Sequence, residues 1–229
     1  MPAAAQIIDL RRVLAERFPK AHAGRSAIAR DGVPVGIASI DSLLGGGWPK
    51  GQVSELVTGE RGSGATQVLH RMLERVAADG GFLAWVDGSD SFDVDAADPA
   101  SLERLLWVRC TDSGQAIKAA DLLLRDRNIP LVVLDLGLNP AAQLRRIPST
   151  VWHRFSRLIE HNGATLLVVA PHPLVGSPAC RVRLRNRLTL DALHHGPTAV
   201  SLRIRCEVER TPATQIQSDP EAHSLARTA

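Results

Sequence analysis

A glycine-rich segment at residues 59–66, with the sequence GERGSGAT, gives the clearest chemical signal in the chain. The apolar run before it, residues 52–58, predicts a strand, and the periodic run after it, residues 65–78, predicts a helix. This is the context of the phosphate-binding pattern G-x-x-x-x-G-K-[ST], in which backbone N–H groups and a helix N-terminus attract an anion. The candidate phosphate site therefore consists of Gly59, Arg61, Gly62, Gly64 and Thr66, with the Thr66 hydroxyl as a ligand for Mg²⁺.

The lysine that completes this pattern is missing, because Ala65 occupies its position. A lysine there contacts the β- and γ-phosphates, and losing such a charge-assisted contact costs on the order of 2–3 kcal/mol. The transition state needs that charge more than the ground state does, so turnover suffers more than binding. Arg61 is the nearby cation that offers compensation. An ordinary glycine-rich turn between a strand and a helix is the alternative interpretation.

Asp135 ends a continuous apolar run, residues 131–134, and resembles the aspartate that holds the water shell of a nucleotide-bound metal. Many strands end in aspartate, so this residue alone carries little weight. Together with the upstream glycine segment, it adds a second component to a candidate nucleotide site.

The arrangement of apolar runs predicts an α/β fold. Runs that are apolar throughout, separated by amphipathic segments, are typical of a parallel sheet covered by helices on both faces. Two later segments alternate between apolar and polar residues and predict antiparallel strands. The further strands are expected at 82–86, 106–109, 131–134, 165–170, 182–190 and 200–208, and the further helices at 113–127 and 149–162.

We expect three parts: residues 1–32 as a helix and linker, residues 33–210 as the core domain, and residues 211–229 as a disordered polar tail. Within the first part, residues 4–18 carry an apolar helical stripe. That stripe packs on the chain's own core or docks on another protein, and both interpretations stay open. Its members are Ile7, Leu10, Val13, Leu14 and Phe18.

Four arginines alternate along the first C-terminal strand, so their side chains share one face: Arg181, Arg183, Arg185 and Arg187. They predict either a surface for phosphates or acidic partners, or a solvated strand face. Aromatic residues make up only 3% of the chain and tyrosine is absent, which disfavours a surface for base stacking.

Composition narrows the classes of protein further. The formal net charge is +3, which permits nucleic-acid binding without demonstrating it. The three cysteines, Cys110, Cys180 and Cys206, are far apart, which disfavours disulfides and zinc and suits a reducing cytoplasm. Adjacent or widely spaced histidines give no chelating pair, so we expect no metal site. We expect a cytoplasmic protein, because neither a signal peptide nor a long apolar span is visible.

Taken together, these segments resemble RecA recombinases over roughly residues 5–210. The resemblance includes VGIASID and LLGGGWPKG at residues 35–51, FLAWVD at 82–87, DSGQA at 112–116, and the strand that ends at Asp135. It implies a RecA-like core built around an ATP site.

The departures from the RecA pattern affect the same site. The family's catalytic glutamate, two residues after the position of Asp87, is replaced by Ser89, so a general base is missing. The family's γ-phosphate-sensing glutamine matches His172. The segments that follow Asp135 and His172 are also short where the family carries DNA-binding loops. The resemblance thus implies neither ATP turnover nor filament-type DNA binding, and we expect no bound cofactor.

A small RecA-like chain with these losses most closely resembles ImuA-type proteins, which accompany the polymerase-like subunit ImuB and an error-prone polymerase in SOS translesion synthesis. This resemblance implies a non-catalytic adaptor that binds RecA, ImuB or both, with weak or indirect DNA binding and no membrane partner. Two alternatives stay open: an ATP-dependent enzyme in which Arg61 replaces the lysine, and an inhibitor of cell division resembling SulA.

Overall fold

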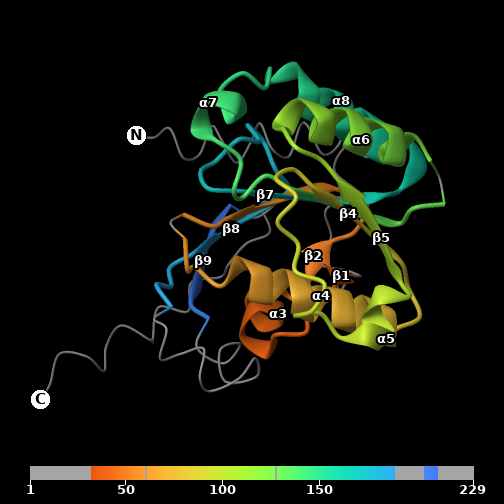
Figure 1. Cartoon of the computed structure of the whole chain (residues 1–229), viewed down its shortest axis with the longest axis vertical. Coiled ribbons are helices and arrows are strands. Elements are labelled where there is room, and N and C mark those ends of the chain that lie inside the picture. Colours follow the sequence, from red (N-terminus) through yellow and green to blue (C-terminus); the bar gives the residue numbers. More distant parts are fainter. Residues whose placement is uncertain (1–31, 60, 127, 189–203, 211–229) are drawn as a thin grey trace, which may run out of the picture. The chain divides into compact units, whose positions relative to one another are not determined.

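The computed structural model of the chain describes residues 32–210, apart from residues 60, 127 and 189–203. The main sheet consists of β3 (Val53–Val57), β4 (Leu83–Asp87), β5 (Leu105–Arg109), β6 (Leu131–Asp135), β7 (Thr165–Ala170), β8 (Cys180–Leu184) and β9 (Cys206–Arg210). The strand order is β5-β4-β6-β7-β3-β8-β9 (Figure 1). A small antiparallel pair joins β1 (Gly32–Val33) to β2 (Trp48–Pro49).

Every neighbouring pair in the main sheet is parallel except the last, in which β9 runs antiparallel to β8. This confirms the predicted α/β class with a mostly parallel sheet and antiparallel strands at its C-terminal end. β7 lies between β3 and β6, so the strand that leads into the glycine segment is separated by one strand from the strand that ends at Asp135.

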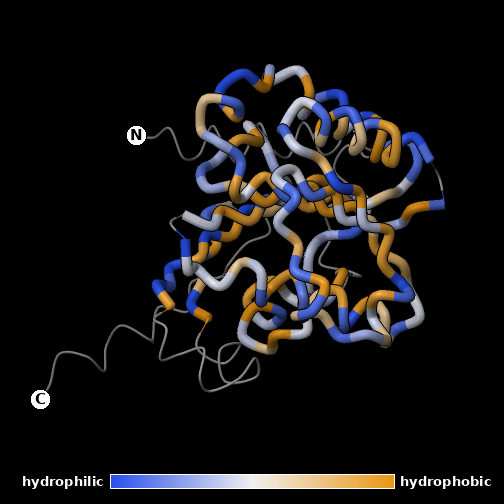
Figure 2. The backbone as a smooth tube through the Cα atoms, viewed as in Figure 1, coloured by the Kyte–Doolittle hydropathy of each residue, from blue (hydrophilic) through white to orange (hydrophobic). Residues whose placement is uncertain are grey.

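Helices cover both faces of the sheet, and each face has its own apolar core (Figures 1 and 2). On one face, Val68, Leu69, Met72 and Leu73 of the helix α4 pack against alternate strand residues such as Leu56 and Val133. On the other, the intervening strand residues meet a second set of helices. The first set is α3 (Ala38–Leu44), α4 (Ala65–Ala78) and α5 (Pro99–Leu102), and the second is α6 (Ser113–Arg125), α7 (Ala141–Leu144) and α8 (Thr150–Asn162).

Most bounds agree closely with the sequence pattern. α4 begins and ends where expected, and α6 begins after Asp112, whose side chain accepts from the Gln115 N–H as an N-cap. The two C-terminal strands are the exception. β8 begins earlier than expected and pairs only as far as Leu184, because its ladder with β9 ends at the Leu184–Cys206 pair. Beyond that pair the Arg185 N–H still donates to the carbonyl oxygen of Arg205 at 2.9 Å, and residues 189–203, which include the rest of the expected alternation, lie outside the described residues.

The expected N-terminal helix, with its apolar stripe, and the expected C-terminal tail lie outside the described residues. In the described part of the chain, no helix has the length and apolar character needed to cross a membrane.

A buried ion pair links three parts of the fold. Glu55, in the middle of β3, is fully buried, and its carboxylate accepts from Arg181 Nε of β8 at 2.6 Å. The same carboxylate accepts from the N–H groups of Leu174 and Val175 at 2.6 and 3.0 Å. Arg181 also donates to the carbonyl oxygen of Val175. The pair therefore fixes the segment after β7 against β3 and β8.

Removing the Arg181 side chain is expected to destabilise the fold strongly, because Glu55 would remain buried without its counter-charge. We expect Arg181→Ala to lower the free energy of unfolding by about 3–5 kcal/mol, measured by urea denaturation. The matched control is Arg185→Ala, since Arg185 pairs with Glu207 where both side chains are more than half exposed. That change is expected to cost less than about 1 kcal/mol. Equal losses in the two variants would contradict the assignment.

Candidate functional site

Three glycines of the segment 59–66 adopt left-handed backbone conformations. The segment connects the end of β3 to the start of α4, and Gly59, Gly62 and Gly64 all have positive φ, of 66°, 80° and 87°. A side chain at these left-handed positions would be strained, so glycine is needed there. Gly64 is the N-cap of α4 and no side chain caps that helix. These conformations before an uncapped helix N-terminus are compatible with the expected phosphate site, which stays a prediction.

The side chains around the segment do not complete such a site. Ala65, at the first position of α4, provides only a methyl group. Arg61 and Thr66 are both exposed. The expected Mg²⁺ ligand thus has access to solvent, and Arg61 is the cation that the described residues of the segment itself provide.

Aliphatic side chains lie against the same segment. The Leu188 N–H donates to the carbonyl oxygen of Gly62 at 2.7 Å. A Cβ atom at Gly64 would lie 3.4 Å from Leu188 Cδ1 and 3.5 Å from Ile204 Cδ1. These neighbours lower the polarity around the segment, which raises the cost of holding a phosphate without a matching cation.

Asp87, at the end of β4, is fully buried, and its carboxylate holds the backbone of the loop that follows it. Its carboxylate accepts from the N–H groups of Ser89, Ser91 and Phe92, at 3.2, 2.7 and 2.7 Å. The Ser89 hydroxyl donates to the Ser91 hydroxyl at 3.1 Å. Position 89, where a catalytic glutamate is expected, therefore carries a serine, and this serine belongs to a loop whose backbone is hydrogen-bonded to Asp87.

Asp135 is paired in register with Asp87 on the neighbouring strand, so both carboxylates lie on the face covered by α4. Burial raises the pKa of Asp135 to about 6, and the nearby charge of Asp87 adds to the rise. The Gly137 N–H, which donates to Asp135 Oδ1 at 2.9 Å, opposes it. At neutral pH the Asp135 carboxyl is mainly ionised and remains suited to holding a metal's water shell.

His172 follows the end of β7, at the same edge of the sheet as the glycine segment. The two are close because the Thr58 N–H, just before Gly59, donates to the carbonyl oxygen of Ala170 at 2.8 Å. His172 therefore lies near the start of the glycine segment, and its match to the family's γ-phosphate-sensing glutamine stays a prediction. Two residues further on, the Glu55 carboxylate fixes the backbone, so this segment is held to the core.

Carboxylate groups of the chain pair with the alternating arginines that begin on β8. Arg181 pairs with Glu55, Arg183 with Glu209, and Arg185 with Glu207. Arg187 is exposed just beyond the end of β8. Interleaved carboxylates reduce the positive potential of this face, and its binding to phosphates or acidic partners stays a prediction. No group of three or more His, Cys, Asp or Glu side chains in the described ranges is arranged to hold a metal ion.

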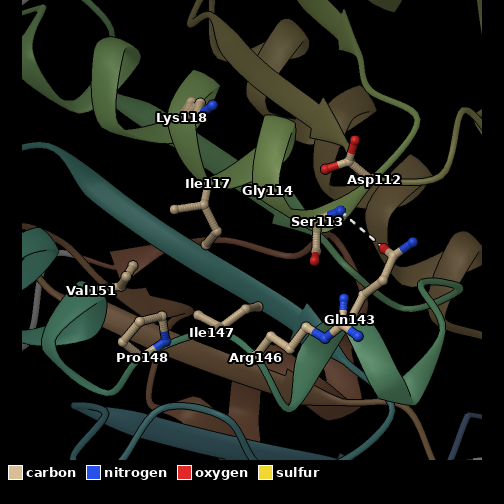
Figure 3. A pocket seen from close by; sticks show the side chains of 10 residues that line it. All are labelled: Asp112, Ser113, Gly114, Ile117, Lys118, Gln143, Arg146, Ile147, Pro148 and Val151. Carbon is tan, nitrogen blue, oxygen red and sulfur yellow. Dashed lines mark hydrogen bonds between the residues drawn. The ribbon is translucent and has the colours of Figure 1, made fainter.

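A hollow of about 430 Å³, which no sequence pattern predicted, lies between the start of α6, the turn after α7 and the start of α8 (Figure 3). Its lining residues come from two separate stretches, 112–118 and 143–151. The Asp112 cap was the only local signal, because the hollow itself forms only when the helices pack.

A mostly parallel sheet with a glycine segment between β3 and α4, and an aspartate at the end of β6, defines a P-loop-type core. The sequence profile of the RecA N-terminal domain matches residues 22–146. The chain therefore belongs to the RecA N-terminal domain family.

Individual relatives are similar at low identity. The RecA protein of Kineococcus radiotolerans is 26% identical over 208 aligned residues, covering 77% of this chain and 60% of the relative. The RecA protein of Picosynechococcus is 31% identical over 134 residues, covering 53% and 38%. The crystal structure of the RadB recombinase superposes with a TM-score of 0.54 at 20% identity, covering 66% of this chain and 82% of RadB, which supports the fold alone. The chain spans about 60% of the length of the Kineococcus RecA.

The raised pKa of Asp135 predicts a pH-dependent gain in stability for Asp135→Asn. The folded chain binds the proton of the Asp135 carboxyl more tightly than the unfolded chain does. The ionised carboxylate therefore lowers the stability of the fold, and this cost grows as the pH rises from 3.8 to about 6 and is constant at higher pH. We expect the variant to gain on the order of 2 kcal/mol at about pH 7.5, and the gain to shrink toward about pH 4. Urea denaturation across this range measures it.

Asp90→Asn is the control with the opposite sign. A hydrogen bond from Arg109 lowers the pKa of Asp90, so its carboxylate stabilises the fold above its unfolded pKa and loses that effect as pH falls. A gain for Asp135→Asn that did not change with pH would contradict the assigned shift.

Proposed function

We propose that this protein is a non-catalytic RecA-family adaptor in SOS-induced mutagenic translesion DNA synthesis, as in ImuA-type proteins. Its partners would be RecA, an ImuB-type polymerase subunit, or both, within an error-prone polymerase complex. The main support is a preserved RecA-family fold around a site with three replacements. Ala65, Ser89 and His172 stand where the family places its lysine, glutamate and glutamine.

The losses fall on different steps of ATP hydrolysis. Without the lysine, charge developing on the transferred phosphate lacks its main counter-charge. Without the glutamate, no carboxylate at position 89 activates water, and the nearby Asp87 carboxylate already accepts three backbone N–H groups. Because the three replacements act on binding, water activation and coupling, restoring one of them would not restore turnover.

An adaptor role accounts for what the chain retains. The two apolar cores and the register of the sheet remain intact, although neither requires ATP chemistry. The apolar stripe at residues 7–18, which lies outside the described residues, is predicted from its spacing to be helical and would suit docking on a partner. A stable core that presents recognition elements is sufficient for an adaptor.

Calorimetric titration with Mg²⁺–ATP tests the loss of catalysis. We expect no detectable binding to the native chain. Ala65→Lys is expected to introduce measurable binding, because the backbone loop is already formed, while phosphate release stays at background, because Ser89 provides no base. Arg61→Ala is the matched control. ATP turnover by the native chain that Arg61→Ala abolishes would overturn the proposal in favour of an ATP-dependent enzyme.

Co-purification tests the partners. The full chain is expected to retain RecA or the ImuB-type subunit, and deletion of residues 1–20 is expected to abolish retention of at least one of them. Replacing Leu10 and Leu14 with Asp should reproduce that loss, while replacing Arg11 and Arg12 with Ala should not, because only the first pair removes the apolar stripe. Failure of the full chain to retain either partner, with inhibition of FtsZ polymerisation, would instead favour a division inhibitor.

A further inference from the structure

The hollow beside α6 has one polar end and one apolar side (Figure 3). Two segments that are separate in the sequence form it, one at the start of α6 and the other running from α7 into α8. It is lined by Asp112, Ser113, Gly114, Ile117, Lys118, Gln143, Arg146, Ile147, Pro148 and Val151.

The polar end presents two hydrogen-bond donors that remain unused within the described part of the chain. The N–H groups of Ser113 and Gln115 already donate, to Gln143 Oε1 at 3.1 Å and to Asp112 Oδ1 at 2.9 Å. The Gly114 N–H and the Ser113 hydroxyl have no acceptor among the described residues. Ser113 is 5% exposed, and its hydroxyl points into the hollow (Figure 3). The Gly114 N–H and the Ser113 hydroxyl can therefore both donate to an acceptor that comes from outside the chain.

The charges around the hollow favour an anionic acceptor. Lys118 on α6 and Arg146 after α7 are both exposed and line it. The opposing charge is the carboxylate of Asp112, which already caps α6. The lining therefore carries one more positive charge than negative, at the N-terminus of a 13-residue helix whose dipole also favours an anion.

The remaining side is aliphatic. It consists of Ile117, Ile147, Pro148 and Val151, and the lining that the described residues provide contains no aromatic side chain. Single-stranded nucleic acid is usually held by aromatic stacking together with several phosphate contacts, and this lining offers no such stacking. Aliphatic side chains next to a carboxylate fit these surroundings better.

We propose that this hollow docks an acidic-aliphatic segment of a partner protein. The carboxylate of an Asp or Glu in that segment accepts from the Gly114 N–H and the Ser113 hydroxyl, between Lys118 and Arg146. A neighbouring Leu, Ile or Val side chain packs on Ile117 and the turn after α7. This inference deepens the proposed adaptor role by giving the chemistry of one partner segment, but it requires no particular partner.

A phage-displayed library of random dodecapeptides, selected on the full-length chain, tests the proposal. We expect enrichment of sequences with Asp or Glu beside an aliphatic residue. A fluorescein-labelled copy of the most enriched peptide should bind Arg146→Glu at least about tenfold more weakly than the native chain. Arg145→Glu is the matched control, because Arg145 is equally exposed but does not line the hollow. It should bind within about twofold of the native chain, because its exposed side chain does not line the hollow and exposed charge pairs contribute little.

Absence of an acidic-aliphatic consensus, or equal weakening by Arg145→Glu and Arg146→Glu, would overturn the inference. So would a labelled single-stranded oligonucleotide whose binding Arg146→Glu abolished and Arg145→Glu preserved, because the hollow would then bind phosphates. Equal melting temperatures for the two variants would show that the difference lies in binding. Retention of RecA or the ImuB-type subunit is measured separately, so failure of the peptide screen would leave the adaptor proposal standing.

Discussion

Strands β3, β7, β6 and β4 run parallel through a sheet that helices bury on both faces. Buried backbone N–H and C=O groups must be paired, so these strands cannot slip without losing a whole ladder of hydrogen bonds. Parallel strands in fixed register bring their carboxyl ends to one edge. The glycine segment, Asp87, Asp135 and His172 therefore stay together at that edge, whatever chemistry their side chains perform.

Polar groups near that edge have structural roles. The Asp87 carboxylate organises the loop after β4, and the Gly62 carbonyl accepts from Leu188. Glu55, on β3, holds the segment after β7 together with Arg181. The loop after β4, the glycine segment and the segment after β7 cannot easily rearrange when a phosphate binds, because each movement would leave one of these acceptors unpaired. This is consistent with a RecA-family core that no longer couples nucleotide state to loop position.

The sequence predicted the buried strands and long helices well, because Val, Leu and Ile runs and the Asp112 cap are local signals. It missed α3, α5 and α7, since α3 has no side-chain cap and α5 and α7 are only four residues long. The partners of Arg183 and Arg185 could not be predicted, because they lie on β9 and depend on its register. The hollow could not be predicted either, because it forms only when α6, α7 and α8 pack together.

The hollow lies near the carboxyl ends of the strands, because α6 follows β5 and α7 follows β6. α/β sheets bind ligands at this edge since loops and helix N-termini converge there. The glycine segment lies on the face of the sheet that α4 covers, and the hollow lies on the face that α6 covers. Its unused donors are a backbone N–H and a serine hydroxyl at the start of a helix, which the loss of a lysine on the other face does not affect. Replacement of the nucleotide-site residues on one face is therefore compatible with the proposed recognition site in the hollow on the other face.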